Sequence, residues 1–342
     1  MSRNEFKGKT ILIAVPDYIG LPNRFRKNLE ALGFVVFNIS SDVNLKIGLK
    51  NTLIHLYKKI VLGIKTYKRE RKQLLDFFGQ LEKLKQQNIN QFDFALFIRP
   101  DNFSDKLIET VRGHSSKLVA YQWDGMNVYP EAHKKIKFFE RFFVFDFNDL
   151  KNEKLLPLTN FYFDDINPKE NKNDAYFIGN YKADRIELLL NISRKLKDLG
   201  LKTSINLYVY SEDQANQVRE EPINILSNEL TFSENVQNVS QSKIIIDFAN
   251  NVHSGLSMRP FEALGYKKKL ITNNALIKEY DFYRPENIFV IENGNLDGLE
   301  KFISTPYKDL PEEIYEKYSF TNWIKYVMDV KPHLPINFPK KL

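Results

Sequence analysis

Residues 243–274 read KIIIDFANNVHSGLSMRPFEALGYKKKLITNN, and their pattern decides the fold class. The apolar run 244–248 has the length and the β-branched content of a buried strand. A polar loop, 249–257, separates this run from a helix-like segment, and a second short strand, 270–272, follows. Strand, helix and strand in close succession indicate an α/β fold.

The loop of this stretch lies where α/β proteins bind phosphates. Free backbone N–H groups and the helix dipole both point toward a ligand where a strand leads into a helix. Arg259 could hold a diphosphate through two donors, and Glu262, one turn further on, could accept hydrogen bonds from ribose hydroxyls. An Arg and a Glu spaced three apart on a helix also form ordinary solvated ion pairs. Spacing alone leaves both interpretations open.

The same stretch resembles the donor-binding segment of GT-B glycosyltransferases, in particular the bacterial CgeB-like and "group 1" families. In these families a G-L-x-x-R-x-x-E-A-L segment ends the donor loop, and a K-x-L-I-T strand follows. The matching positions here are Gly255, Leu256, Arg259, Glu262, Ala263, Leu264, Leu270, Ile271 and Thr272. The resemblance implies two Rossmann-like domains with mostly parallel sheets that face each other across a cleft, and it assigns the nucleotide-sugar donor to the second domain.

The first half of the chain predicts a βαβ unit. Residues 10–15 and 34–39 form strand-like runs, and an amphipathic helix, 23–32, lies between them. A parallel sheet is therefore expected. Residues 44–87 are predicted to form a long, lysine-rich helical stretch.

A polar segment divides the chain into two α/β halves. We expect an acceptor domain over 1–160, a linker over 161–173, a donor domain over 174–314 and closing helices that return toward the first domain over 315–342. In the second half the expected helix spans 184–199, and the expected strands are 175–178, 204–209, 244–248, 269–272 and 288–291.

Composition excludes several classes of protein. The chain has 342 residues, which suffice for two domains with complete cores. It has no cysteine, so a disulfide scaffold and a thiolate metal site are excluded, and the five histidines are scattered. We therefore predict no metal site and no cofactor. No signal peptide is visible and no stretch is apolar enough to span a bilayer, so a cytoplasmic protein is expected.

Three aspartates are candidates for a catalytic base. Asp17, Asp101 and Asp124 each follow a predicted strand, at the sheet edge where α/β proteins place their sites. Asp124 is favoured because Trp123 beside it could stack on a sugar, and the W-D segment resembles one in bacterial polysaccharide transferases. Each aspartate could instead cap a turn. An enzyme that retains configuration needs no such base.

The resemblance implies further donor-binding residues at the start of the second domain. Gly179 would face the donor phosphates together with Asn180, and Arg185 lies in the following helix, although Gly179 could simply form a turn. His253 and Ser254 belong to the donor loop, where His253 could donate to a diphosphate oxygen.

The basic stretch from Lys46 to Lys72 is either a solvated face or a surface that contacts an anionic membrane. The net charge of +7 fits an anionic partner of either kind. No recognised nucleic-acid module is present, so we expect no nucleic-acid partner.

The predicted function is transfer of a sugar from a nucleotide-sugar donor to a cell-surface glycan or lipid-linked glycan, without a metal. The protein would act in the cytoplasm, either in solution or at the inner face of the cytoplasmic membrane. Three alternatives stay open: a nucleotide-sugar epimerase of the same architecture, a nucleic-acid-binding protein and a scaffold without activity.

Overall fold

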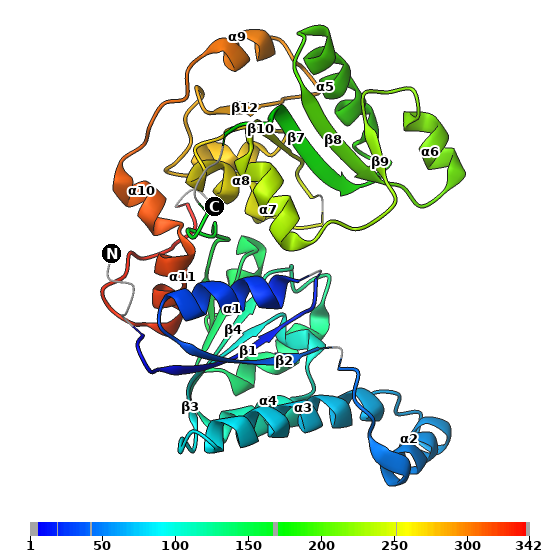
Figure 1. Cartoon of the computed structure of the whole chain (residues 1–342), viewed down its shortest axis with the longest axis vertical. Coiled ribbons are helices and arrows are strands. Elements are labelled where there is room, and N and C mark those ends of the chain that lie inside the picture. The colour runs from blue at the N-terminus through cyan, green and yellow to red at the C-terminus, as the bar shows by residue number, and fades with distance from the viewer. Residues whose placement is uncertain (1–5, 19, 42, 167–169, 251, 340–342) are drawn as a thin grey trace. The chain divides into compact units, whose positions relative to one another are not determined.

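The computed structural model describes residues 6–18, 20–41, 43–166, 170–250 and 252–339. The chain divides into two compact units, Met1–Leu158 with Val327–Lys331, and Thr159–Tyr326 with Pro332–Leu342. Each unit contains a six-stranded parallel sheet that is covered by helices (Figure 1). The expected α/β class with two Rossmann-like halves is confirmed.

The first sheet has the strand order β2-β1-β3-β4-β5-β6, and all neighbouring strands in it are parallel. Helix α1 (Leu21–Ala31) covers one face, and α3 (Tyr67–Lys85) and α4 (Asp105–Arg112) cover the other (Figure 1). Three 3₁₀ segments, η1 (Pro100–Asn102), η2 (Pro130–Phe138) and η3 (Phe147–Lys151), follow strands of this sheet. The strands are β1 (Thr10–Val15), β2 (Val35–Ser40), β3 (Phe92–Ile98), β4 (Ser115–Gln122), β5 (Arg141–Val144) and β6 (Leu155–Pro157).

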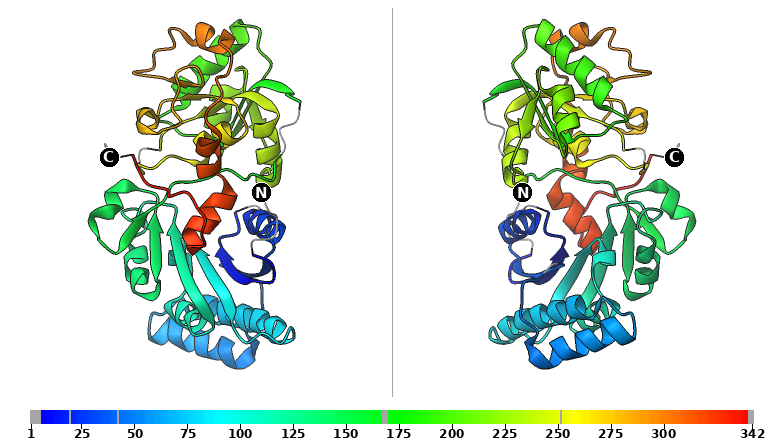
Figure 2. Two further views of the ribbon diagram at one scale, coloured as in Figure 1. Left: turned by 90° about the vertical axis from the view of Figure 1, so that its left-hand side faces the viewer. Right: turned by 90° about the vertical axis from the view of Figure 1, so that its right-hand side faces the viewer.

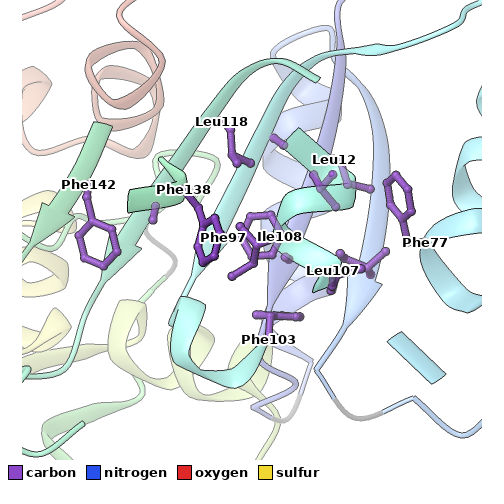
Figure 3. Packing of buried hydrophobic residues seen from close by; sticks show 14 of the residues in the cluster. Leu12, Phe77, Phe97, Phe103, Leu107, Ile108, Leu118, Phe138 and Phe142 are labelled. Atoms are coloured by element: carbon purple, nitrogen blue, oxygen red, sulfur yellow. The ribbon is translucent and has the colours of Figure 1, made fainter. Parts of the chain in front are cut away.

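One core cluster of the first unit lies between this sheet and helices α3 and α4 (Figure 3). Leu12 and Phe97 come from the strands, whereas Phe77 comes from α3 and Leu107 from α4, and all four are almost fully buried. Each such side chain contributes roughly 1.5–3 kcal/mol by leaving water. This apolar layer fixes the positions of the strands, and therefore of the residues that follow their carboxyl ends.

The helical stretch predicted for residues 44–87 is two helices, α2 (Gly48–Val61) and α3. Gly63 ends α2 because it adopts a left-handed conformation with φ of 68°, and the N–H of Ile64 donates to the carbonyl of Lys58 at 2.9 Å. Figure 2 shows α2 beside α3, on the side turned away from the sheet. The lysine-rich helical stretch is therefore interrupted at this glycine, a break that was not predicted from the sequence.

The second sheet has the order β12-β11-β10-β7-β8-β9 and is again parallel. The strands are β7 (Asn173–Asn180), β8 (Thr203–Tyr208), β9 (Asn224–Leu226), β10 (Ser242–Asp247), β11 (Lys269–Thr272) and β12 (Ile288–Val290). The accompanying helices are α5 (Ile186–Asp198), α6 (Glu212–Val218), α7 (Phe232–Ser240), α8 (Met258–Gly265), η4 (Ala275–Glu279), α9 (Leu299–Ser304), α10 (Glu312–Lys317) and α11 (Phe320–Met328).

One feature of the second unit extends the expectation, and another differs from it. Gly179 and Asn180, expected just after a strand over 175–178, are the last two residues of β7. Residues 161–163 of the predicted linker are buried aromatic residues of this unit, and the ring centroid of Phe161 lies 4.7 Å from that of Trp323. Their aromatic character, and not the polar residues that follow them, determines where they lie.

One helical glycine is required by packing. A Cβ atom added at Gly265, the last residue of α8, would lie 2.1 Å from Cγ of Tyr162, which is itself buried. The first atom of a ring cannot swing away, so Gly265→Ala is expected to cost roughly 1–3 kcal/mol of unfolding free energy or more. Urea denaturation measures this difference.

Gly79 in α3 is the matched control for this substitution. It has open space where a Cβ would go, so Gly79→Ala should stabilise by about 0.5–1 kcal/mol through helix propensity. Equal effects of the two substitutions would contradict the packing argument.

Candidate functional site

A buried arginine joins the carboxyl ends of two strands in the first unit. Arg99 follows β3, and its side chain is only 4% exposed. It donates to both carboxylate oxygens of Asp101, from Nε at 2.8 Å and from a terminal nitrogen at 2.7 Å. Its other terminal nitrogen is ion-paired with Asp124, which follows β4. Two of the three predicted aspartates are therefore brought together by one guanidinium.

The backbone of Arg99 is strained, with φ of 54° and ψ of 65° in the left-handed region. Such conformations persist where surrounding contacts compensate for them, and they concentrate at functional sites. Burial lowers the pKa of Arg99, but the hydrogen bonds and negative charge of Asp101, together with the charge of Asp124, outweigh burial and raise it. The guanidinium is therefore a permanent cation at the edge of the sheet.

Aromatic rings surround this ion pair. The ring of Tyr129 lies over the guanidinium, with the carbon of Arg99 at 3.6 Å from the ring centroid. Tyr18, in the segment after β1, stacks on Trp123 with ring centroids 6.0 Å apart. Burial raises the pKa of the Tyr18 hydroxyl, the charge of Arg99 opposes this, and the charge of Asp124 adds to it. Aromatic faces therefore lie beside two carboxylates at this edge of the sheet.

A groove of about 730 Å³ opens beside Asp101. It is lined by polar and charged residues at the starts of α3 and α4, among them Arg69, Glu70 and Ser104. Asp17, the third predicted aspartate, is exposed after β1, and the structure gives it no contact with Arg99. The cluster therefore includes Asp101 and Asp124 but not Asp17.

Sequence reasoning overlooked Arg99, Tyr18 and Tyr129. Arg99 directly precedes Pro100 and Asp101 after a strand, which is a visible signal. Its left-handed backbone and its pairing across to the next strand depend on the fold and give no signal in the sequence.

A second arginine–carboxylate pair lies in the second unit, within α8. Arg259 is ion-paired with Glu262, and Glu262 is fully buried. Burial lowers the pKa of Arg259, but the charge of Glu262 outweighs it and raises that pKa. Oε1 of Glu262 has no hydrogen-bond partner within the described ranges. A buried carboxylate oxygen without a donor is costly, typically by about 1–3 kcal/mol, and a ligand hydroxyl would satisfy it.

The pair is positioned by a capped helix start. Ser257 is the N-cap of α8, and its hydroxyl accepts from the N–H of Arg259 at 3.2 Å and donates to the carboxylate of Asp247 at 3.0 Å. Asp247 is the last residue of β10 and is almost fully buried. Burial raises the pKa of Asp247 to about 6, against the opposing effects of Ser257, Arg259 and Arg185.

Three predicted donor-binding residues lie at the adjacent strand end and the helix that follows it. A Cβ added at Gly179 would lie 3.0 Å from the Phe177 ring and 3.8 Å from a guanidinium nitrogen of Arg185. Arg185 is the N-cap residue of α5, and burial lowers its pKa against the charges of Asp184 and Asp247. Asn180 is exposed and accepts from the hydroxyl of Tyr210 at 2.8 Å. The positive charges of Arg185 and Arg259 therefore both lower the pKa of Asp247, against the effect of burial.

The loop before α8 holds the remaining predicted residues. His253, Ser254 and Gly255 are half-buried, and the N–H of His253 donates to the carbonyl of Asn250 at 3.1 Å. Leu256 has its side chain in the core, and its carbonyl accepts from Asn160 at 2.9 Å. Leu256 thus anchors the loop through its side chain and its carbonyl.

Within the described residues, no group of three or more His, Asp or Glu side chains is placed to hold a metal ion. A cavity of about 320 Å³, lined by Lys243, Lys268 and Tyr307 among others, lies at the opposite, amino-terminal edge of the second sheet. It is separate from Arg259 and Glu262, which are not among its lining residues.

Solved structures share this architecture. An α-glucosyltransferase in complex with UDP and a 13-mer DNA containing a central A:G mismatch has a TM-score of 0.57 at 11% identity, over 90% of this chain and 92% of its own. A second α-glucosyltransferase complex, with UDP and DNA containing an HMU base, has a TM-score of 0.52 at 11% identity, over 86% and 90%. The OtsA apo structure has a TM-score of 0.51 at 11% identity, over 96% and 100%.

These neighbours are GT-B glycosyltransferases, and the chain has the GT-B fold. No protein-family model and no curated protein matches the sequence. The CgeB-like and "group 1" resemblance stays a prediction.

The raised pKa of Asp247 makes the stability depend on pH. An unfolded aspartate loses its proton near pH 3.8, but folded Asp247 keeps it to about pH 6. The folded state is therefore destabilised as pH rises from 4 to 6, by up to about 3 kcal/mol above pH 6. Asp247→Asn should be more stable than the parent at pH 7 and should lack this fall.

Chemical denaturation at several pH values measures the effect, and Asp297→Asn, at an exposed site, is the control with no expected change. A loss of stability in Asp247→Asn at pH 7 would contradict the assignment.

Proposed function

We propose that this protein is a glycosyltransferase that moves a sugar from a nucleotide-sugar donor to a glycan of the cell surface, such as lipopolysaccharide, O-antigen or capsule. The observation that carries the proposal is the Arg259–Glu262 pair at the start of α8, with a buried carboxylate oxygen left without a donor. The UDP in two structural neighbours supports a nucleotide donor.

The donor is assigned to the second unit. The guanidinium of Arg259 would bind the diphosphate, and the unpartnered oxygen of Glu262 would accept from a ribose hydroxyl. The N-terminus of α8 and the cations of Arg185 and Arg259 would stabilise the negative charge that develops on the leaving diphosphate.

The acceptor is assigned to the first unit. Tyr18 and Trp123 offer a stacked aromatic surface, and Asp101 and Asp124 offer acceptors for sugar hydroxyls. Asp124 is the better candidate for the base because its side chain is 25% exposed, whereas that of Asp101 is 8% exposed and uses both oxygens on Arg99. The Arg99 ion pair would hold Asp124 toward the acceptor hydroxyl from which it takes a proton.

The proposal is tested with a panel of nucleotide sugars. A thermal-shift screen identifies the donor, since a ligand at 100 times its dissociation constant stabilises by about 2.7 kcal/mol. Product analysis then follows the labelled sugar into a glycan acceptor. Conversion of the nucleotide sugar to another nucleotide sugar in the absence of acceptor would indicate an epimerase. Transfer of the sugar to DNA, which is bound in two of the neighbouring structures, would show that DNA and not a glycan is the acceptor.

Arg259→Ala is expected to weaken nucleotide binding by roughly 1.5–3 kcal/mol because it removes a charge-assisted contact to the diphosphate. Isothermal titration calorimetry measures the change. Arg194→Ala is the matched control, because Arg194 of α5 forms an exposed ion pair with Glu221 in the same unit. Unchanged affinity in Arg259→Ala and in Glu262→Gln, with both variants folded, would refute the donor site.

Transfer is proposed to need no divalent metal, since cationic side chains and a helix N-terminus stand where the diphosphate would lie. Turnover should therefore persist when EDTA is added. Turnover that EDTA abolishes and manganese or magnesium restores would contradict this mechanism.

Asp124→Asn is expected to reduce turnover by about 10²–10⁴-fold while donor affinity stays constant, because it removes the base and preserves size. Steady-state kinetics together with calorimetry separates the two effects. Asp101→Asn and Asp17→Asn are the controls. Full turnover in Asp124→Asn with a loss in Asp101→Asn would move the base to Asp101, and full turnover in all three variants would favour a retaining enzyme.

A further inference from the structure

Helix α2 presents its apolar side to solvent. Leu49, Leu53, Leu56 and Ile60 are spaced by four, three and four residues, which places them on one face of the helix. Their exposed fractions are 87%, 67%, 45% and 77%. No residue of α2 is buried, so this stripe of leucine and isoleucine is a true surface of the first unit.

The other side of α2 is held to α3 by polar contacts. Asn51 accepts from the hydroxyl of Tyr67 at 3.0 Å, and the ammonium of Lys58 lies 4.5 Å from the centroid of the same ring. Asn51 and Lys58 lie on the side of the helix opposite to Leu53 and Ile60, and they are only half-exposed. The usual arrangement of a surface helix, with the apolar face inward, is therefore reversed.

The sequence around the apolar stripe is rich in basic residues, and acidic residues are absent from it. Residues 43–69 contain no Asp or Glu. They contain seven basic residues, namely Lys46, Lys50, Lys58, Lys59, Lys65, Lys68 and Arg69. Such a surface combines apolar area with positive charge, which is the chemistry of a helix that lies in the interface of an anionic bilayer.

We propose that α2 inserts its Leu49–Ile60 stripe between the headgroups of an anionic membrane, with the flanking lysines on lipid phosphates. A nucleic acid would use the lysines but would leave the leucines in water, so the outward apolar face favours lipid. Among the described residues no helix is long and apolar enough to cross a membrane, and α2 is an interfacial element.

This position would also serve the proposed function. The segment after α2 leads directly to Thr66 and Arg69, which line the groove beside Asp101. An acceptor carried on a lipid would then reach the groove from the membrane surface. This last step rests on the proposed glycosyl transfer, whereas insertion of α2 does not.

The experiment uses the absence of cysteine in this chain. Leu53→Cys carries a single environment-sensitive nitrobenzoxadiazole label, and Glu212→Cys, at an exposed position of α6, carries the same label as the control. Vesicles of phosphatidylcholine mixed with phosphatidylglycerol should raise and blue-shift the fluorescence at residue 53 but not at residue 212. Phosphatidylcholine alone should have little effect.

Vesicle co-sedimentation then compares two double variants. Leu53→Glu with Ile60→Glu should lower the partition coefficient at least about tenfold, because it removes apolar burial and adds two negative charges that the anionic surface repels. Lys50→Gln with Lys59→Gln should lower it about tenfold at low salt and less at high salt. All four side chains are exposed, so unchanged thermal unfolding should confirm that both variants fold.

Several outcomes would overturn the inference. These are equal binding to neutral and anionic vesicles, no binding to either, or unchanged binding of the Leu53→Glu, Ile60→Glu variant. Binding of duplex DNA in place of vesicles would show that the lysines bind nucleic acid. A dimer that the Leu53→Glu, Ile60→Glu variant alone abolishes would show that the stripe binds a second copy of the chain. Because vesicle binding needs no nucleotide sugar, its failure is separate from a failure of the proposed function.

Discussion

Parallel strand pairing is the constraint from which both candidate sites follow. In a parallel sheet all strands begin at one edge and end at the other, so residues far apart in sequence converge where the strands end. Arg99 and Asp124 meet in this way after β3 and β4, and Arg185, which follows β7, acts electrostatically on Asp247 at the end of β10. Neither group could form in an antiparallel sheet with the same strands.

Both groups are built on the same interaction: a guanidinium is removed from water and its charge is balanced by a carboxylate. A buried charge is tolerated only with a partner of opposite sign and with satisfied hydrogen bonds. Arg99 meets this condition with two carboxylates, whereas the pair of Arg259 and Glu262 leaves one oxygen unsatisfied. The first group is thus complete within the chain, whereas in our proposal a ligand hydroxyl completes the second. This difference is why the donor is assigned to the second unit.

The sequence predicted the fold well where strands are long and apolar. Thr10–Val15 and the run after Lys243 could be identified as buried strands from their composition alone. The strand β9 has only three residues, is largely exposed and contains no apolar run, so no pattern in the sequence predicts it. The break between α2 and α3 had a signal in Gly63, but the lysine-rich pattern continued across it.

The candidate sites were predictable in position but not in pairing. That Asp101 and Asp124 follow strands is visible in the sequence, and the rule for parallel sheets then places them at one edge. Their shared partner Arg99 depends on the neighbour order of β3 and β4 and on a left-handed backbone, which no local pattern encodes. Asp247 was not singled out within the run 244–248, because burial of a single acid depends on what packs over it.

The outward-facing apolar stripe of α2 should also affect how the solubility of the protein depends on salt. A net charge of +7 keeps copies apart at low ionic strength, whereas added salt screens that repulsion and strengthens attraction between apolar stripes. Colloidal stability should therefore decrease as salt increases, and precipitation by salting-out should begin at this helix. High-salt washes that strip bound polyanions from a basic protein would, for this molecule, promote self-association.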